Sequence, residues 1–290
     1  MVGFFFLSYR PIRWLQFVVV LCCSGLAVAT GWTADSSGLC HAIAARLSSV
    51  PAAECLARKL VASSGTSVSG RPLLLREHGP LPGKTPQAKV LLIGGMHGDE
   101  YTSISLIFAW MRLLERYHSG LFHWRIVPLL NPDGLLHQPS QRVNEHGVDL
   151  NRNFPTRDWQ TESLAYWQQK TQRDSRRYPG SAAMVEPESR WLAEEIRAFA
   201  PDVIVSVHAP LGVVDFDGPA RVTPPRKLGP LPLRPMGTYP GSLGRYAGEE
   251  MGIPVLTIEL ASATRMLSPA DSRKVWGDLI SWLRLQVKNH

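Results

Sequence analysis

The sequence predicts an α/β fold in which a mixed, mostly parallel sheet is flanked by helices on both faces. Two observations carry this prediction. Short, continuous apolar runs recur along the chain, and such runs are typical of strands buried on both faces. Segments with helical periodicity separate the runs, an alternation typical of α/β domains. The 290 residues suffice to bury a sizeable core in one domain.

The first half of the chain supplies two strands and one helix. AKVLLIGG (88–95) predicts a buried strand, and HWRIVPLLNPDG (123–134) predicts a second one that closes with Asn-Pro-Asp-Gly turn chemistry. Between them, residues 101–117 predict a helix because apolar side chains recur on one face. That face consists of Ile104, Ile107, Phe108, Met111 and Leu114.

The second half continues the alternation. EPESRWLAEEIRAFAP (186–201) predicts a helix, DVIVSVH (202–208) a third buried strand and IPVLTIEL (253–260) a fourth. A terminal helix is expected to begin after Ser268, which can cap it, with Pro269 at its first position.

Residues 219–240 interrupt this rhythm, because they contain seven prolines and four basic residues. A long proline-rich loop within a compact domain is usually functional or disordered. One hypothesis is that its basic side chains recruit an acidic peptide, and the alternative is a solvated loop. The four residues are Arg221, Arg226, Lys227 and Arg234.

The first 30 residues have the pattern of a secretory signal peptide. Arg10 and Arg13 precede an apolar stretch, residues 14–29, whose small residues near the end offer a cleavage site. This stretch is shorter than the roughly 20 residues that a membrane-spanning helix needs. We therefore expect residues 1–30 to be removed from an exported bacterial protein, periplasmic or secreted, that keeps no stable membrane anchor.

Residues 31–68 are expected to form a small N-terminal helical segment, ahead of a catalytic domain at 69–290. The Ser/Gly-rich stretch 62–72 is interpreted as a linker or as the edge of the main domain. After signal cleavage, Cys40 and Cys55 are the remaining cysteines. In an oxidising compartment two cysteines most simply form one disulfide, and two unpaired buried thiols are the alternative.

The formal charge of +7 favours acidic partners, and loss of Arg10 and Arg13 lowers it to +5. No run of five or more basic residues and no recognisable nucleic-acid module accompanies this charge. Nucleic acid is therefore not an expected partner.

Ionisable side chains follow or end three of the predicted strands. His97 and Glu100 follow the first strand, His208 ends the third, and Glu259 occupies an apolar position in the fourth. A carboxylate buried in such a run is costly unless a cation or donors compensate it. His-x-x-Glu alone is often a surface pair, but together these four residues supply the ligands and the base of a catalytic zinc site.

Five short motifs then place these residues in a wider pattern. In chain order they are HGDE (97–100), NPDG (131–134), GVDLNRNF (147–154), SVH (206–208) and TIEL (257–260). In this order they resemble the M14 family of zinc carboxypeptidases, over about residues 69–285. GSAAMVEPESRWL, HAPLG and PGSLG further resemble a short bacterial branch, which hydrolyses the bond between γ-D-glutamate and meso-diaminopimelate in peptidoglycan peptides.

The resemblance implies a metal site and a base. His97, Glu100 and His208 would bind one Zn²⁺ per chain, and Glu259 would be the general base. Asp149 would accept a hydrogen bond from a ligand histidine and so orient it. Taken alone, Asp149 could instead pair with an arginine for structural reasons.

The resemblance also implies substrate contacts. Arg142 would stabilise the oxyanion, while Asn151 and Arg152 would hold a free carboxylate of the substrate. Tyr239 is the first candidate for the tyrosine that lies over this carboxylate, and Tyr246 is the second. Taken alone, Arg142 could be a surface cation and Asn151 a loop cap.

The expected function is therefore zinc-dependent hydrolysis of an amide bond next to a free carboxylate, in a peptidoglycan-derived or other carboxylate-bearing peptide. One alternative is an N-deacylase of the aspartoacylase and succinylglutamate desuccinylase type. GVDLNRNF, NPDG and the export signal favour a peptide substrate over it. The other alternative is a non-catalytic cell-wall-binding protein of the same fold, against which the retained ligands and Glu259 argue.

Overall fold

The computed structural model describes residues 1–3 and 36–287, and the described residues from Ser36 onward belong to one compact unit. The expected signal peptide lies almost entirely outside the described residues, so it stays a prediction. Within the described part of the chain, no helix is both long and apolar enough to cross a membrane.

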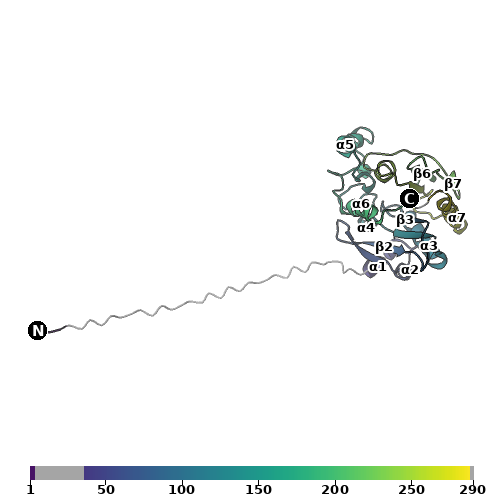
Figure 1. Cartoon of the computed structure of the whole chain (residues 1–290). Helices are drawn as coiled ribbons and strands as arrows, with labels where there is room; N and C mark the ends of the chain where they lie inside the picture. Colours follow the sequence, from purple (N-terminus) through teal and green to yellow (C-terminus); the bar gives the residue numbers. More distant parts are fainter. Residues whose placement is uncertain (4–35, 288–290) are drawn as a thin grey trace. The chain divides into compact units, whose positions relative to one another are not determined.

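A seven-stranded mixed sheet with the order β1-β2-β4-β3-β5-β9-β6 forms the centre of this unit (Figure 1). The central strands β4, β3, β5 and β9 pair in parallel, whereas β2 and β6 are antiparallel to their neighbours. β1 is antiparallel to β2 and so shares the direction of the central strands. The strands are β1 (Val61–Thr66), β2 (Pro72–His78), β3 (Ala88–Ile93), β4 (Phe122–Val127), β5 (Val203–His208), β6 (Val213–Asp217) and β9 (Val255–Glu259), and β7 (Lys227–Leu228) pairs separately with β8 (Leu231–Pro232).

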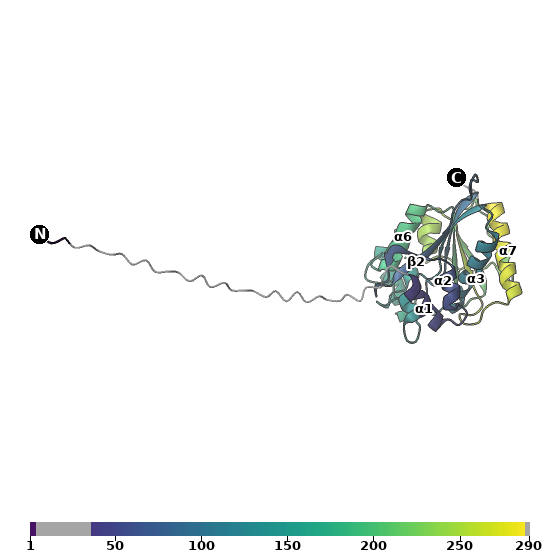
Figure 2. The same cartoon turned by 90° about the horizontal axis from the view of Figure 1, so that it is seen from below.

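Helices cover both faces of the sheet, with α6 on one face and α3 and α7 on the other (Figure 2). The α/β fold expected from the sequence is thus confirmed. The helices are α1 (Ser36–Arg46), α2 (Ala52–Ala57), α3 (Tyr101–Tyr117), α4 (Pro132–Leu136), α5 (Trp159–Gln169), α6 (Pro187–Phe199) and α7 (Pro269–Gln286). Two 3₁₀ turns, η1 (Leu150–Arg152) and η2 (Ser175–Arg177), and a π-helix, η3 (Gly244–Glu250), complete the unit.

Strand alternation explains why β5 can serve both the core and a polar site. Val205 packs in the core cluster on the α3 side, and Ile204 packs with α6 residues such as Trp191 on the other side. Side chains two apart on a strand point to the same face. Ser206 and His208 therefore project from the same face as Ile204, which is the α6 side.

The helix ends follow ordinary capping chemistry. α3 has the predicted bounds, and all five residues of its expected apolar face are buried. Ser268 caps α7 by accepting a hydrogen bond from the backbone N–H of Asp271. The Asn-Pro-Asp-Gly stretch corrects the prediction, because it begins α4 instead of forming a simple turn: Asn131 accepts a hydrogen bond from Gly134.

The N-terminal segment contains the expected helices but continues directly into the main sheet. Cys40 of α1 and Cys55 of α2 are fully buried and joined by a disulfide. The stretch interpreted as a linker or as the edge of the main domain contains the edge strand β1. Residues 36–66 and the rest of the fold therefore share one core, on the face that α1 and α3 cover.

Candidate metal centre and active-site cavity

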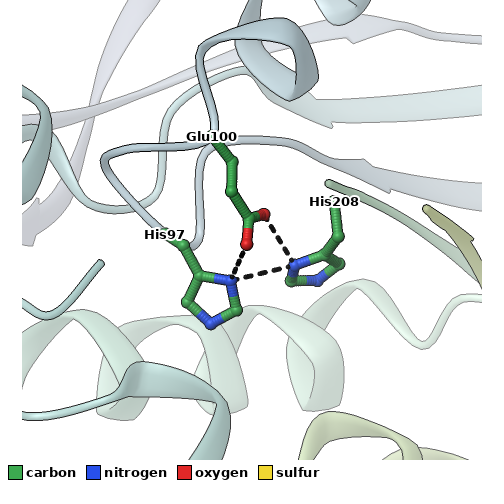
Figure 3. Close-up of side chains that lie close together, drawn as sticks. All are labelled: His97, Glu100 and His208. Carbon is green, nitrogen blue, oxygen red and sulfur yellow. Dashed lines mark hydrogen bonds and ion pairs between the residues drawn. The ribbon is translucent and has the colours of Figure 1, made fainter. Parts of the chain in front are cut away.

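His97, Glu100 and His208 meet at the carboxyl ends of β3 and β5 (Figure 3). After β3 the chain turns through Gly94 and Gly95, and Gly95 has φ +58°, a value that favours glycine. A Cβ on Gly94 would lie 2.6 Å from Ile107, so this turn also needs the absence of a side chain. His97 follows the turn, and Glu100 immediately precedes α3.

The donor atoms of this trio point to one place. His97 Nδ1 lies 2.8 Å from Glu100 Oε1, and His208 Nδ1 lies 3.2 Å from Glu100 Oε2. The two Nδ1 atoms are 3.1 Å apart, and one ligand atom from each of the three residues falls within 4.8 Å of the others. All three side chains are almost completely buried.

The outer ring nitrogens have partners that are compatible with the tautomers needed for metal binding. His97 Nε2 is 3.1 Å from Asp149 Oδ1, and His208 Nε2 is 2.9 Å from Ser206 Oγ. When both Nε2–H groups donate outward, both Nδ1 lone pairs face Glu100. Two imidazole nitrogens and a carboxylate form a typical donor set for zinc, so these residues fit the metal that the family implies.

The charges around the trio keep the carboxylates of Glu100 and the neighbouring Asp149 ionised. Burial alone would raise the pKa of Glu100, but the rings of His97 and His208 hold it below its usual range. Burial would likewise raise the pKa of Asp149, but Arg142 and His97 hold it well below its usual range. Arg142 Nε donates to Asp149 Oδ2 at 3.1 Å and its Nη1 to Glu100 Oε1 at 3.3 Å. Arg142 is therefore no isolated surface cation, and it also borders the cavity described next.

A cavity of about 320 Å³ opens beside the trio, on the face of the sheet that carries His208. Glu259 lies directly opposite His208 in the β5–β9 pairing and borders this cavity. Its side chain is 9% exposed, and its Oε2 has no hydrogen-bond partner among the described residues. Burial raises the pKa of Glu259. A buried carboxylate oxygen with an open lone pair next to a metal site is suited to accept a proton from water.

Asn151 and Arg152 border the same cavity from η1, which Asp149 caps through the backbone N–H of Asn151. Asn151 Oδ1 accepts a hydrogen bond from the backbone N–H of Leu243 at 2.8 Å, which leaves the amide NH₂ as the group available for a ligand. Arg152 is 7% exposed, and its buried Nε has no partner among the described residues. A guanidinium that borders a cavity and keeps an unpaired N–H is suited to bind a carboxylate.

The structure distinguishes the two candidate tyrosines. The ring of Tyr239 borders the cavity and lies 4.5 Å from the guanidinium carbon of Arg152. Tyr246 is buried in the core, where its ring stacks on Phe154 and its hydroxyl accepts a hydrogen bond from Arg197. Tyr239 is therefore the tyrosine that a ligand in the cavity would meet.

The proline-rich stretch 219–240 reaches the cavity only through its C-terminal part, including Met236 and Tyr239. None of the four basic residues singled out in this stretch borders the cavity. The basic residues that border the cavity are Arg142 and Arg152 and, from η2, Arg176 and Arg177. Arg176 pairs with Asp99. The hypothesis that the proline-rich basic residues recruit substrate therefore finds no support in the geometry.

Sequence reasoning missed three side chains of the site. Ser206 stands two residues before His208, and this spacing places both on one face of a strand, a signal that was present in the sequence. Asp215 and Asp217 of β6 also border the cavity. Their strand lies outside the predicted elements, so the sequence offered no reason to single them out.

Comparison with known proteins agrees with this geometry. Residues 54–214, more than half of the chain, match the zinc carboxypeptidase family model Peptidase_M14. The chain belongs to this M14 zinc carboxypeptidase family. It is accordingly a hydrolase with the metallocarboxypeptidase fold.

Two named relatives are similar to this M14 chain. Murein peptide amidase A of Vibrio campbellii is 34% identical over 206 residues, which is 68% of this chain and 78% of the relative. Murein peptide amidase A of Escherichia coli K12 is 33% identical over 153 residues, 52% of this chain and 60% of the relative.

Solved structures agree with the family assignment. The crystal structure of murein-tripeptide amidase MpaA from Escherichia coli O157 matches with a TM-score of 0.51 and 27% identity, over 76% of this chain and 88% of that chain. Carboxypeptidase A from Helicoverpa armigera matches with a TM-score of 0.59 over 80% of this chain and 70% of that chain. Its 16% identity indicates a shared fold alone.

Proposed function

We propose that this M14 hydrolase cleaves an amide bond next to a free carboxylate in peptidoglycan-derived peptides, namely the bond between γ-D-glutamate and meso-diaminopimelate. One observation carries the reaction type: Glu259 and Arg152 border the same cavity beside the trio, and the buried atoms Glu259 Oε2 and Arg152 Nε have no partner among the described residues. The cavity thus brings together a carboxylate that can accept a proton and a guanidinium that can bind a carboxylate. The names of the similar amidases from Vibrio and Escherichia support the substrate class.

We further propose that His97, Glu100 and His208 hold one Zn²⁺ per chain, with Asp149 and Ser206 orienting the two histidines. When bound, zinc supplies Lewis-acid chemistry, because it lowers the pKa of water and polarises a carbonyl group. The charged groups next to the metal site come from the chain itself. The ionised Glu100 and Asp149 surround the cationic Arg142.

Binding fixes the register of the substrate before any bond changes. The free carboxylate accepts hydrogen bonds from Arg152 and from the amide NH₂ of Asn151, while Tyr239 packs beside it. This anchors the scissile amide within reach of Glu259 and Arg142, which border the same cavity. Such positioning contributes to catalysis because it removes the entropic cost of bringing the reacting groups together.

Glu259 then moves one proton from water to the leaving group. Its Oε2 accepts a proton as the water oxygen attacks the amide carbon, and N–H groups of Arg142 donate to the carbonyl oxygen as negative charge develops there. The guanidinium has five N–H groups, more than its contacts with Asp149 and Glu100 consume. Protonated Glu259 next gives its proton to the amide nitrogen as the C–N bond breaks. The products are a carboxylate and a free amine.

The location proposed for this reaction is outside the cytoplasm. The pattern of residues 1–30, with two arginines ahead of an apolar stretch, supports export. The disulfide between Cys40 and Cys55 agrees with an oxidising compartment.

The decisive experiment is incubation of zinc-loaded protein with L-Ala-γ-D-Glu-meso-diaminopimelate and with the corresponding tetrapeptide, followed by mass spectrometry. Release of free diaminopimelate from the tripeptide is the expected result. N-acetylaspartate and N-succinylglutamate serve as comparison substrates for the N-deacylase alternative. Cleavage of these two compounds, with both muropeptides left intact, would overturn the proposal.

A further inference from the structure

One loop carries four of the side chains that the proposed reaction uses. Arg142, Asp149, Asn151 and Arg152 all belong to residues 142–153, which we call the site loop. The structure describes this whole loop, and the 3₁₀ turn η1 is its one regular element. Side chains on loops are held less accurately than those on helices or strands, and a displacement of about 1 Å can lower a reaction rate about 10²-fold. The accuracy of the site therefore depends on what anchors the site loop.

Asn144 anchors the first half of the site loop. It is fully buried, and its Oδ1 accepts hydrogen bonds at 3.2 and 3.1 Å from two backbone N–H groups of the turn that separates Arg142 from Asp149. Its Nδ2 donates to the carboxylates of Glu186 at 2.6 Å and Glu188 at 3.1 Å, both buried at the N-terminal end of α6. An asparagine amide has two donors and two acceptor sites, so every one of them is used here.

Asn153 anchors the other end of the site loop to the same helix. It is fully buried and directly follows η1, which carries both residues proposed to hold the substrate's carboxylate. Its Oδ1 accepts hydrogen bonds from the backbone N–H of Glu186 at 3.3 Å and from the hydroxyl of Ser189 at 2.7 Å. Its Nδ2 donates to the backbone carbonyl groups of Pro179 at 2.7 Å and Ala182 at 2.8 Å.

The N-terminal end of α6 is a firm support for both asparagines. The helix packs through buried side chains such as Trp191 and Ile196 against the sheet. Negative charge is favourable at a helix N-terminus, and Glu188 also accepts a hydrogen bond from the backbone N–H of Val68 at 3.1 Å. Neither asparagine borders the cavity. Both can therefore influence a reaction there only through the residues that they hold in place.

We propose that the two asparagines are positioning residues with separate tasks. Asn144 positions Arg142 and Asp149, which are the donor to the oxyanion and the acceptor for a ligand histidine. Asn153 positions η1 and thereby the side chains that hold the carboxylate of the substrate. This inference rests on the proposed function, because it divides the roles assigned there between two anchors on one helix.

The kinetics of Asn144→Ala and Asn153→Ala on L-Ala-γ-D-Glu-meso-diaminopimelate, at saturating zinc, test this division. An interaction made only in the transition state affects kcat without KM, whereas one made equally with the bound substrate affects KM. Asn144→Ala should therefore lower kcat by up to about 10²-fold and leave KM nearly unchanged. Asn153→Ala should raise KM about tenfold and change kcat less, because hydrogen bonds to the substrate's carboxylate are weakened.

Two milder variants keep the test valid if an alanine variant does not fold, which circular dichroism and thermal melting would show. Glu188→Gln has one side-chain oxygen and so cannot accept hydrogen bonds from both Asn144 and the backbone N–H of Val68. Ser189→Ala removes one of the two hydrogen bonds to Asn153 Oδ1. Each variant should change the same kinetic constant as replacement of the asparagine that it supports, by a smaller factor.

Gln87→Ala is the matched control. The side-chain amide of Gln87 also donates to two backbone carbonyl groups, those of Arg284 and Val287, but Gln87 immediately precedes β3, whereas His97 follows the other end of that strand. This change should lower the melting temperature without altering kcat or KM.

The zinc Kd, measured by competition with a chelator, gives a readout that needs no turnover. Asn144→Ala should raise it about tenfold through Asp149, and Asn153→Ala should leave it unchanged. If kcat and KM change alike in both asparagine variants, or change equally in Gln87→Ala, the inference is overturned and the proposed function stands. If the unmodified enzyme leaves the tripeptide intact, the proposed function fails, and an equal zinc Kd in both asparagine variants then overturns the inference as well.

Discussion

Ser206→Ala should weaken zinc binding although Ser206 is not a ligand. Its hydroxyl lies 2.9 Å from His208 Nε2, and both side chains are almost fully buried. Metal binding requires the lone pair of His208 Nδ1, so the ring proton must reside on Nε2. Without the hydroxyl, that N–H loses the acceptor that the fold provides.

The penalty falls on the metal-bound state. In the metal-free protein the ring can place its proton on Nδ1 and donate to Glu100 Oε2, which is 3.2 Å away. In the metal-bound protein Nδ1 would bind zinc, so the ring proton cannot move there. A buried donor left unpaired costs about 1–3 kcal/mol. Loss of an outer hydrogen-bond partner typically weakens metal affinity about 10- to 100-fold, and we expect the zinc Kd to rise by that factor.

The assay is competition between the protein and a chromophoric zinc chelator, with circular dichroism and thermal melting to show that the variant is folded. Ser206→Thr keeps a hydroxyl on the same face and should retain much of the affinity. At saturating zinc, the fold-change in kcat relative to the unmodified enzyme should be smaller than the fold-change in the zinc Kd. A folded Ser206→Ala protein with an unchanged zinc Kd would refute the assignment of Ser206 as an orienting residue.

Three further predictions follow from the site and the fold. Glu259→Gln should bind zinc normally but lose about 10²- to 10⁴-fold in kcat, because an amide cannot accept the proton of water; near-normal turnover of a zinc-replete sample would show that another group is the base. Replacing Cys40 and Cys55 by serine should lower the free energy of unfolding by about 3 kcal/mol, from the 15-residue separation of the two cysteines, as measured by denaturant titration. The raised pKa of Asp217, about 7 in the fold against 3.8 when unperturbed, means that its ionisation opposes folding, so its contribution to stability falls as pH rises through this range. Asp217→Asn should therefore flatten the decline of Tm between pH 4 and pH 7, and an identical pH dependence in both proteins would contradict burial as the main cause of that raised pKa.

The sequence was informative wherever a local pattern had a single physical interpretation. The bounds of α3 were predictable because its apolar residues recur on one face, and the trio was predictable because His97 and His208 follow apolar strands. The strands β1, β2 and β6 were not predicted. Each is an outer strand of the sheet or lies next to one, and none has the long continuous apolar run of the central strands, as the sequence VASSGT of β1 illustrates.

Other parts of the site depend on the path of the chain through space. Tyr239 and Tyr246 are seven residues apart in sequence, and only the packing of η3 determines that the second ring stacks on Phe154 while the first meets Arg152. The carboxylates of β6 enter the cavity because that strand pairs antiparallel with β9, a long-range choice that no nearby residue signals. For the same reason the charges of the proline-rich stretch could not be placed from the sequence.

A side chain at Gly244 would change the lining of the cavity beside the trio. A glycine codon becomes an alanine codon through one base substitution, and the added methyl group would occupy the place of Asp217 Oδ2, which is 2.1 Å from it. The carboxylate of Asp217 would then have to move, whereas none of the atoms nearest to the added methyl group belongs to His97, Glu100, His208 or Glu259. A single base change could thus reshape the cavity at a position separate from the trio and the base.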